Sequence, residues 1–356
     1  PLAGFAIGWI YQSLGRDIQR GNNLIFEEIH EPKQILPARM APLILLGTVV
    51  THLFGGSAGR EGTAVQMGAA LSDQLNQFFK IDPKERKILL IAGVGASFGA
   101  AIGTPWAGIV FGMEVLYVGR LKIFAALECL IASFCAYATT LLLKAPHTVY
   151  PRPHLGLFSL TTLAWVSVAG ILFGLVAVGF CRLTHLIEKL ETRWISYAPL
   201  RPFVGGLVLI ALYFSEGSFR YAGLGISTIQ NSFLQVSSFK DPFFKCVATA
   251  ITIASGFKGG EFIPLVFMGS TLGSALTHFL PVSTDLLAAV GFAAVFGAAS
   301  NTPLACTLMA IELFGVGIAP YALVGCLMAY LFSSHRGIYS SQLIRNPKPL
   351  AKIFGK

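Results

Sequence analysis

The stretch from Phe54 to Thr63 reads Phe-Gly-Gly-Ser-Ala-Gly-Arg-Glu-Gly-Thr, and it places an ionisable acid inside a glycine-rich break. An apolar run from Ala41 to Leu53 precedes the break, and Ala64-Val65 follows it. A carboxylic acid in apolar surroundings is costly unless it is paired, hydrogen-bonded or protonated. We therefore expect Glu61 to be a functional group.

The composition predicts an all-α polytopic membrane protein. Of the 356 residues, 54% are hydrophobic and only 12% are charged, whereas a soluble globular domain has roughly 25% charged residues. Many apolar runs are shorter than the roughly 20 residues that a spanning helix needs, and several contain Gly or Pro. Because irregular backbone persists at membrane depth only inside protein or along a cavity, we expect broken and re-entrant helices.

The net charge of +9 does not predict a nucleic-acid partner. Its basic residues gather in short connections between apolar runs, a pattern typical of cytoplasmic loops. The alternative is that these loops are solvated and carry no topological signal. The expected cytoplasmic clusters are Lys80, Lys84, Arg86 and Lys87, and in the tail Arg345, Lys348, Lys352 and Lys356.

Other sequence signals narrow the chemistry. The six cysteines form no CxxC pair and no metal-ligand spacing is present, so we expect neither a metal nor a cofactor. The chain opens on Pro1 without a signal-peptide pattern, and we expect some N-terminal residues to be missing.

Part of the sequence occurs twice. The segment 98–114 recurs as 296–312, and both copies keep Phe-Gly-Ala-Ala, Thr-Pro, an alanine and a final glutamate. Residues 59–68 also match 260–269, and Gly21 has a fainter counterpart in Gly225. We predict two related halves, 1–145 and 155–356, joined by a linker at 146–154, with a short cytoplasmic tail and no regulatory soluble domain. Transporters built from two repeats have discontinuous helices and a site at the repeat interface.

Three glycine-rich turns each precede a helix-compatible apolar run. They begin at Gly21, Gly59 and Gly259. A helix start leaves free N–H groups and a partial positive charge, so several starts aimed at one point form an anion site. Glycine also lets the backbone approach an ion closely. The pattern therefore predicts an anion-binding site.

Glu61 stands at one of these helix starts, where its carboxylate can occupy the place of an anion. Protonation would neutralise it and release the place, which couples an anion to a proton without covalent chemistry. The alternative is an ordinary capping carboxylate paired with Arg60.

Gly-Arg-Glu-Gly-Thr at 59–63, Gly-Gly-Glu-Phe-Ile-Pro at 259–264 and Tyr339 after Arg336-Gly337-Ile338 resemble motifs of the CLC family of anion channels and anion/proton antiporters. The resemblance runs over almost the whole chain. It implies a homodimer whose subunits each have a pathway, built from two inverted halves. It also implies that Phe262 and Tyr339 line the anion path.

Three departures resemble the fluoride-transporting branch of that family. Chloride members begin with Gly-Ser-Gly-Ile-Pro, where this chain has Gly21-Asn22-Asn23; Thr63 stands where proline is usual, and Glu261 precedes Phe262 in place of an apolar residue. The resemblance assigns anion selection to Asn22, whose amide can donate hydrogen bonds to a small anion. Asn22 and Asn23 are also suited to cap a helix, and the two roles are compatible.

The residues expected to carry the proton also differ from those of chloride antiporters in the family. Glu114 is followed by Val115, so the second glutamate that serves as the internal relay in chloride antiporters is absent. We expect Glu261 to substitute for it close to Glu61, where two like charges would raise each other's proton affinity. Glu114 and its repeat counterpart Glu312 are expected to be structural caps.

We predict a fluoride/proton antiporter in a bacterial cytoplasmic membrane, with fluoride, protons, lipid and a second copy as its partners, and no enzyme activity. Alternatives are a chloride channel or chloride/proton antiporter and, from another class, an intramembrane hydrolase. Hydrolysis would need a nucleophile with a base or a metal pair, but the seven histidines form neither HExxH nor repeat-related pairs. The predicted anion-binding residues are Gly21, Asn22, Asn23, Gly59, Arg60, Gly62, Thr63, Phe262, Ile263 and Tyr339, and the proton-handling residues are Glu61 and Glu261.

Overall fold

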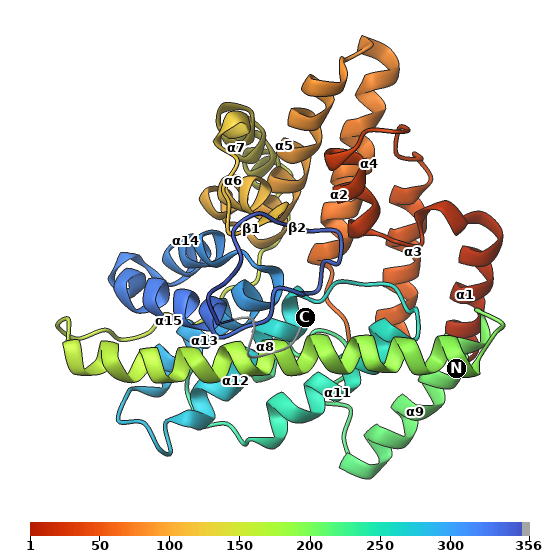
Figure 1. The fold of residues 1–356 in the computed structure, drawn as a ribbon. Coiled ribbons are helices and arrows are strands. Elements are labelled where there is room, and N and C mark those ends of the chain that lie inside the picture. Colours follow the sequence, from red (N-terminus) through yellow and green to blue (C-terminus); the bar gives the residue numbers. More distant parts are fainter. Residues whose placement is uncertain (351–356) are drawn as a thin grey trace.

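The computed structural model describes residues 1–350, so Lys352 and Lys356 of the basic tail lie outside the described residues. The regular secondary structure of the described residues is almost entirely helical. Figure 1 shows the helices of the first half on one side of the molecule and those of the second half on the other. The first half contains α1 (Leu2–Leu14), α2 (Asn22–His30), α3 (Met40–Leu53), α4 (Glu61–Phe79), α5 (Pro83–Ile102), α6 (Pro105–Glu114) and α7 (Ala126–Leu142). The second contains α8 (Leu160–Trp194), α9 (Leu200–Glu216), α10 (Ile226–Asn231), α11 (Lys240–Ala254), α12 (Phe262–Leu276), α13 (Thr284–Ser300), α14 (Pro303–Phe314) and α15 (Ala319–Leu331).

Three short 3₁₀ helices and one strand pair complete the described chain. The 3₁₀ helices are Arg16–Ile18, Ile123–Ala125 and Val316–Ile318. Strands β1 (Tyr117–Val118) and β2 (Leu343–Ile344) pair in parallel. This pairing attaches the segment after α15 to the connection between α6 and α7.

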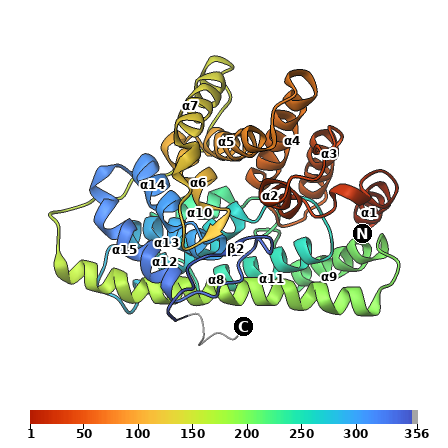
Figure 2. The ribbon, with the colours of Figure 1, turned by 45° about the horizontal axis from the view of Figure 1, so that its top comes forward.

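The predicted all-α architecture of two inverted repeats is confirmed. Helices α1–α7 follow the same order as α9–α15, and the repeated segment covers the end of α5 with α6 and the end of α13 with α14. Helix α8, of 35 residues, crosses the whole width of the molecule in Figures 1 and 2.

The repeated Thr-Pro motif explains two of the helix breaks. Helices α5 and α13 end at Gly103 and Asn301, which adopt left-handed conformations with φ of 89° and 60°. Glycine and asparagine tolerate this conformation best. Pro105 and Pro303 then occupy the first positions of α6 and α14, where a missing N–H is no loss.

Glu114 and Glu312, the glutamates that end the repeated segment, have the expected structural role as caps. Their hydrogen bonds also follow the twofold relation between the halves. Glu114, at the end of α6, accepts hydrogen bonds from Leu304 N at 3.1 Å and Ala305 N at 2.8 Å. Glu312, in α14, accepts from Trp106 N at 3.0 Å and Ala107 N at 2.8 Å. Each half therefore caps the helix start of the other with an acid.

Short helices predominate among the apolar ones, as the sequence predicts. Within residues 1–350, two helical segments are long and apolar enough to cross a membrane, Ile123–Leu142 and Leu160–Trp194. The other apolar helices have 10–17 residues, fewer than the roughly 20 needed to span hydrocarbon.

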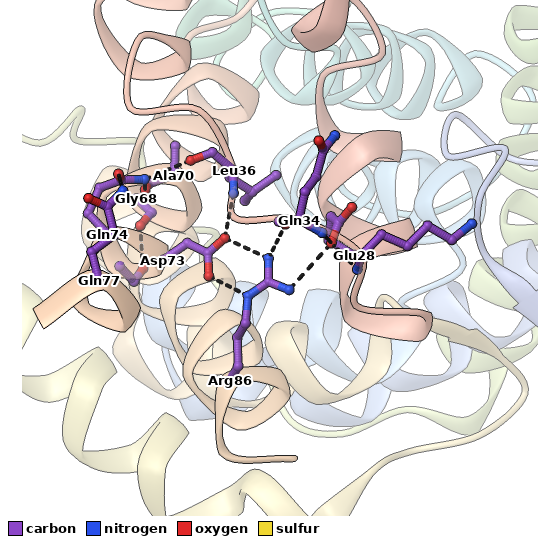
Figure 3. Close-up of polar contacts among 11 residues, drawn as sticks. Glu28, Gln34, Leu36, Gly68, Ala70, Asp73, Gln74, Gln77 and Arg86 are labelled. Atoms are coloured by element: carbon purple, nitrogen blue, oxygen red, sulfur yellow. Dashed lines mark hydrogen bonds and ion pairs between the residues drawn. The ribbon is translucent and has the colours of Figure 1, made fainter. Parts of the chain in front are cut away.

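Arg86 corrects the interpretation of the first basic cluster. It is not a loop charge: it lies in α5, is 5% exposed, and donates to both carboxylate oxygens of Asp73 at 2.7 Å. Arg86 also donates to the Glu28 carboxylate at 3.4 Å and to the Gln34 carbonyl at 2.6 Å. Leu36 N donates to Asp73 (Figure 3). This cluster ties α2 and the chain after it to α4 and α5.

Lys348 likewise differs from a solvated tail residue. It is 2% exposed, and its Nζ donates to Ser333 Oγ at 2.6 Å and to the Ser334 carbonyl at 3.0 Å. The ammonium also lies 4.0 Å from the Tyr330 ring centroid. Lys348 therefore fastens the chain after α15 to that helix.

Candidate functional site

The two halves meet at a pair of glycines that precede α4 and α12. Gly59 N donates to the Gly260 carbonyl at 2.6 Å, and Gly260 N donates to the Gly59 carbonyl at 2.8 Å. These reciprocal bonds form an isolated antiparallel bridge. They place the starts of α4 and α12 side by side, at positions that the sequence repeat already relates.

The start of α2 lies beside the starts of α4 and α12. Asn22 is the first residue of α2, after Gly21 with φ of 53°. A Cβ on Gly62 would lie 3.0 Å from Gly260 Cα and 3.5 Å from Asn22 Nδ2. Glycine at position 62 therefore lets three helix starts adjoin, and their free N–H groups make the region favourable to an anion.

Glu61 fills part of this region with its own carboxylate. The residue is 3% exposed, and its Oε2 accepts a hydrogen bond from Arg60 N at 3.0 Å. A Cβ on Gly59 would lie 2.9 Å from that oxygen and 3.2 Å from Ile263 N. The carboxylate thus lies between the first turns of α4 and α12, where a small anion would be stabilised.

A cavity of about 630 Å³ reaches the same helix starts. Its lining includes Gly21, Asn22, Asn23, Gly259, Glu261 and Tyr339. Five of these six are predicted anion-binding or proton-handling residues, and they come from the first half, the second half and the segment after α15.

The two asparagines have different surroundings. Asn22 is buried, and its Oδ1 has no hydrogen-bond partner in the described chain. Asn23 Oδ1 accepts from Ser341 N at 3.1 Å, two residues after Tyr339. Asn22 is therefore available to a ligand, whereas Asn23 fixes the segment that carries Tyr339.

Glu261 and Tyr339 are neighbours along the cavity. Both residues line it, together with Cys181. Its carboxylate makes no hydrogen bond with Glu61 among the described residues, because Glu61 folds back onto Arg60 N. The expected mutual influence of the two acids is not observed in this conformation.

Phe262 belongs to an aromatic cluster at the repeat interface. Its ring lies 5.7 Å from Phe98 and 4.7 Å from Phe296, both edge-on. Phe98 and Phe296 are the equivalent phenylalanines of the repeated segment, and they stack 6.0 Å apart. The aromatic contacts therefore hold α12, which carries one of the helix starts, against α5 and α13.

Two predicted residues direct their side chains away from the cavity. The Arg60 side chain is 54% exposed, with Nε 3.8 Å from Glu61 Oε1. Thr63 Oγ1 pairs with Thr48 Oγ1 at 2.7 Å. Both line a different pocket, beside α3 and α5, so Arg60 offers the site its backbone N–H rather than its guanidinium.

Two residues near the site escaped the sequence analysis. Gln66 is buried and lines the cavity, with its amide nitrogen 3.1 Å from where a Cβ on Gly21 would lie. Its signal was a polar residue inside the apolar start of α4, four positions after Gly62. Tyr150, between α7 and α8, has its ring centroid 4.8 Å from that of Phe292, whose ring in turn contacts Phe262. No periodicity marks it.

Comparisons with known proteins agree with this geometry. A family model described as "Voltage gated chloride channel" matches residues 3–334. The chain is 45% identical to a "Chloride/fluoride channel protein" of Pseudomonas syringae pv. tomato, over 98% of this chain and 78% of that protein. It is 26% identical to the "H(+)/Cl(-) exchange transporter ClcA" of Yersinia pestis, over 86% and 68%.

Solved structures match as well. The crystal structure of a CLC-type fluoride/proton antiporter has a TM-score of 0.93 and 34% identity, covering 97% of this chain and 87% of that one. A slow cyanobacterial Cl⁻/H⁺ antiporter has a TM-score of 0.79 over 93% and 81%, with 21% identity, which shows likeness of fold. The chain therefore belongs to the voltage gated chloride channel family, the CLC family of membrane transport proteins.

Proposed function

We propose that this protein is a fluoride/proton antiporter that exports fluoride from a bacterial cell in exchange for protons. The observation that carries the proposal is the Glu61 carboxylate, which lies between two helix starts and accepts the Arg60 N–H at 3.0 Å. A carboxylate in that position excludes an anion while it is charged. When a proton neutralises it, the N–H groups become free for fluoride.

Asn22 supports fluoride as the ion. It occupies the place of the serine found in chloride members, and its buried amide has an oxygen without a hydrogen-bond partner in the described chain. Rotation about the last side-chain bond exchanges this oxygen with Nδ2, which donates hydrogen bonds. The 34% identical structure named as a fluoride/proton antiporter supports the same ion.

In this proposal, Glu61 gates the anion site and carries the proton, and Glu261 relays the proton toward the cavity. Gly62 and Ile263 contribute backbone N–H groups, whereas Gly21 and Gly59, whose N–H groups donate to the Ile18 and Gly260 carbonyls, shape the backbone around the ion. Phe262 and Tyr339 line the path, Asn23 positions Tyr339, and Arg60 and Thr63 act through the backbone at the start of α4.

The proposed setting is the cytoplasmic membrane, with the basic loops inside the cell. Partial burial, followed by the charges of Arg120, Arg345 and Lys87, lowers the pKa of Lys122, which lies between β1 and α7. Basic residues in the first turns of α5, before α7 and after α15 therefore lie on the same side, as the positive-inside pattern requires.

We further propose that residues 1–145 and 155–356 are the two repeats, joined by a linker at 146–154, and that the protein is a homodimer with one pathway per subunit. The matching order of α1–α7 and α9–α15 supports this division.

The ion is tested in liposomes that contain the purified protein. Fluoride and chloride electrodes measure efflux of each anion from matched loads, with empty liposomes as the control. We expect rapid fluoride efflux and much slower chloride efflux. Equal rates for the two anions would instead indicate a chloride transporter of the same family.

A further inference from the structure

Lys258 lines the cavity but has no part in the proposed mechanism. It stands in the turn between α11 and α12, directly before Gly259. Its backbone N–H donates to Thr51 Oγ1 of α3 at 3.2 Å. The side chain is therefore rooted beside the helix starts and shares the cavity with Asn22 and Glu261.

Helix α3 leaves a passage for the Lys258 side chain. A Cβ on Gly47 would lie 2.9 Å from Lys258 Cβ and 2.8 Å from its Cγ, closer than side chains normally approach. Beyond this passage, Nζ lies 4.1 Å from the centroid of the Tyr11 ring on α1. The ammonium is thus held against an aromatic face, whereas a snorkelling lysine extends its head into bulk water.

Within residues 1–350, no carboxylate forms an ion pair with Lys258. The acids that line the cavity are Glu188 and Glu261, and Glu261 lies near Tyr339 instead. Arg20, Arg201 and His185 add basic groups to the lining. A positive charge without a counterion in a low-dielectric cleft attracts anions.

Tyr11 supplies a second group that an anion could use. The residue is 4% exposed and lines the same cavity. Its hydroxyl is buried and has no hydrogen-bond partner in the described part of the chain. A buried donor without a partner is unfavourable, and an anion beside the ammonium would accept its hydrogen bond.

We propose that Lys258 and Tyr11 form a second anion-binding site, separate from the three helix starts, which holds a small monovalent anion in the cavity before it reaches Asn22. That this anion is fluoride rests on the proposed function. The site raises the local anion concentration and leaves the proton step unchanged.

The transport test uses Lys258→Met, which keeps an unbranched side chain and removes the charge. Initial fluoride efflux is measured against fluoride concentration in liposomes at low ionic strength. We expect the half-saturating concentration to rise about tenfold, with the maximal rate and the fluoride-to-proton ratio unchanged. The difference should shrink when sulfate salt is added, because added salt screens the charge.

Three variants accompany it. Lys258→Arg keeps the charge and should behave as the unaltered protein, and Lys84→Met removes an exposed lysine at the start of α5 and should change nothing. Tyr11→Phe should raise the half-saturating concentration less than Lys258→Met does. Unaltered concentration dependence in Lys258→Met, or equal impairment in Lys258→Arg, would overturn the proposal.

A binding measurement separates this site from the transport function. Crystals grown in bromide should show anomalous density within about 4 Å of Lys258 Nζ, and Lys258→Met should lose it. Bromide density in a protein that carries no fluoride would refute the proposed function but keep the site. Absent density, with fluoride transport intact, would refute the site alone.

Discussion

Asn22 has a buried side-chain oxygen with no hydrogen-bond partner in the described chain, at the residue to which the family resemblance assigns anion selection. Its amide nitrogen lies beside Gly62, at the meeting point of the three helix starts. Serine at this position would offer a shorter donor from a different point. The residue therefore provides the most local test of which anion is preferred.

We expect Asn22→Ser to lower the ratio of fluoride to chloride efflux about tenfold, because one hydrogen bond to a charged group contributes on the order of 1.5–3 kcal/mol. Parallel electrode measurements in liposomes would give the ratio. Asn231→Ser, at an exposed position of α10, is the matched control. If the ratio of fluoride to chloride efflux is unchanged in Asn22→Ser, the backbone and not the Asn22 side chain selects the anion.

Glu261→Gln should separate fluoride movement from proton movement. The amide keeps the size of the side chain beside Tyr339 but cannot carry a proton. We expect fluoride efflux to continue while proton uptake per fluoride falls, as measured with a fluoride electrode and a pH electrode together. An unaltered ratio would remove Glu261 from the proton path, and Glu85→Gln, at an exposed acid in α5, controls for loss of charge.

Sequence reasoning located the backbone of the site better than its side chains. Gly62, Asn22 and Gly260 meet as the glycine motifs predict, because the repeat relates both turns. Side-chain direction followed the helix period instead: Gln66, four positions after Gly62, shares its face of α4, whereas Thr63 is turned toward Thr48. Motif membership alone could not distinguish these directions.

At the scale of the elements, the cluster of Arg86, Asp73 and Glu28 fixes α2 against α4 and α5 (Figure 3). Helix α2 carries Asn22 at its other end. From the sequence alone, Arg86 resembled a charge in a cytoplasmic loop. Its buried partners, Glu28 and Asp73, come from distant segments of the chain, so no neighbouring residue indicated that it is buried. A charge buried between three elements has no local sequence signal.

Arg86→Met should lower the free energy of unfolding by about 3–5 kcal/mol, since it leaves two buried carboxylates without their partner. Denaturant unfolding of the purified protein in detergent would measure the loss. Arg39→Met removes the arginine of an exposed pair with Asp17 and should cost less than about 1 kcal/mol. An equal loss of unfolding free energy in the two variants would show that the buried cluster stabilises the fold no more than the exposed pair does.

The repeat shows how much of the element order the sequence contained. The repeat of residues 98–114 as 296–312 predicted two related halves, and in the structure each copy forms the end of one helix and the next helix. Gly103 and Asn301 both adopt left-handed conformations, which explains why the two copies can differ there. Helix α8 begins with an apolar run from Leu160 to Phe180. It continues to Trp194 because charged residues such as Glu188 and Lys189 are good helix formers outside hydrocarbon.

At the scale of the whole molecule, two inverted halves meet at the Gly59 and Gly260 bridge, and a protonatable carboxylate lies beside it. Inversion places equivalent helix starts from opposite directions at one depth, which a single helix pair could not do. In the proposed mechanism, Glu61 is a proton-dependent substitute for the transported anion.

That claim is tested by imposing a pH gradient on liposomes that contain the protein and equal fluoride on both sides. In the unaltered protein, proton flow should drive fluoride against its own gradient, as recorded by a fluoride electrode. In Glu61→Gln, where the side chain can neither hold a charge nor carry a proton, the pH gradient should move no fluoride. Continued proton-driven fluoride movement in Glu61→Gln would contradict this role of Glu61.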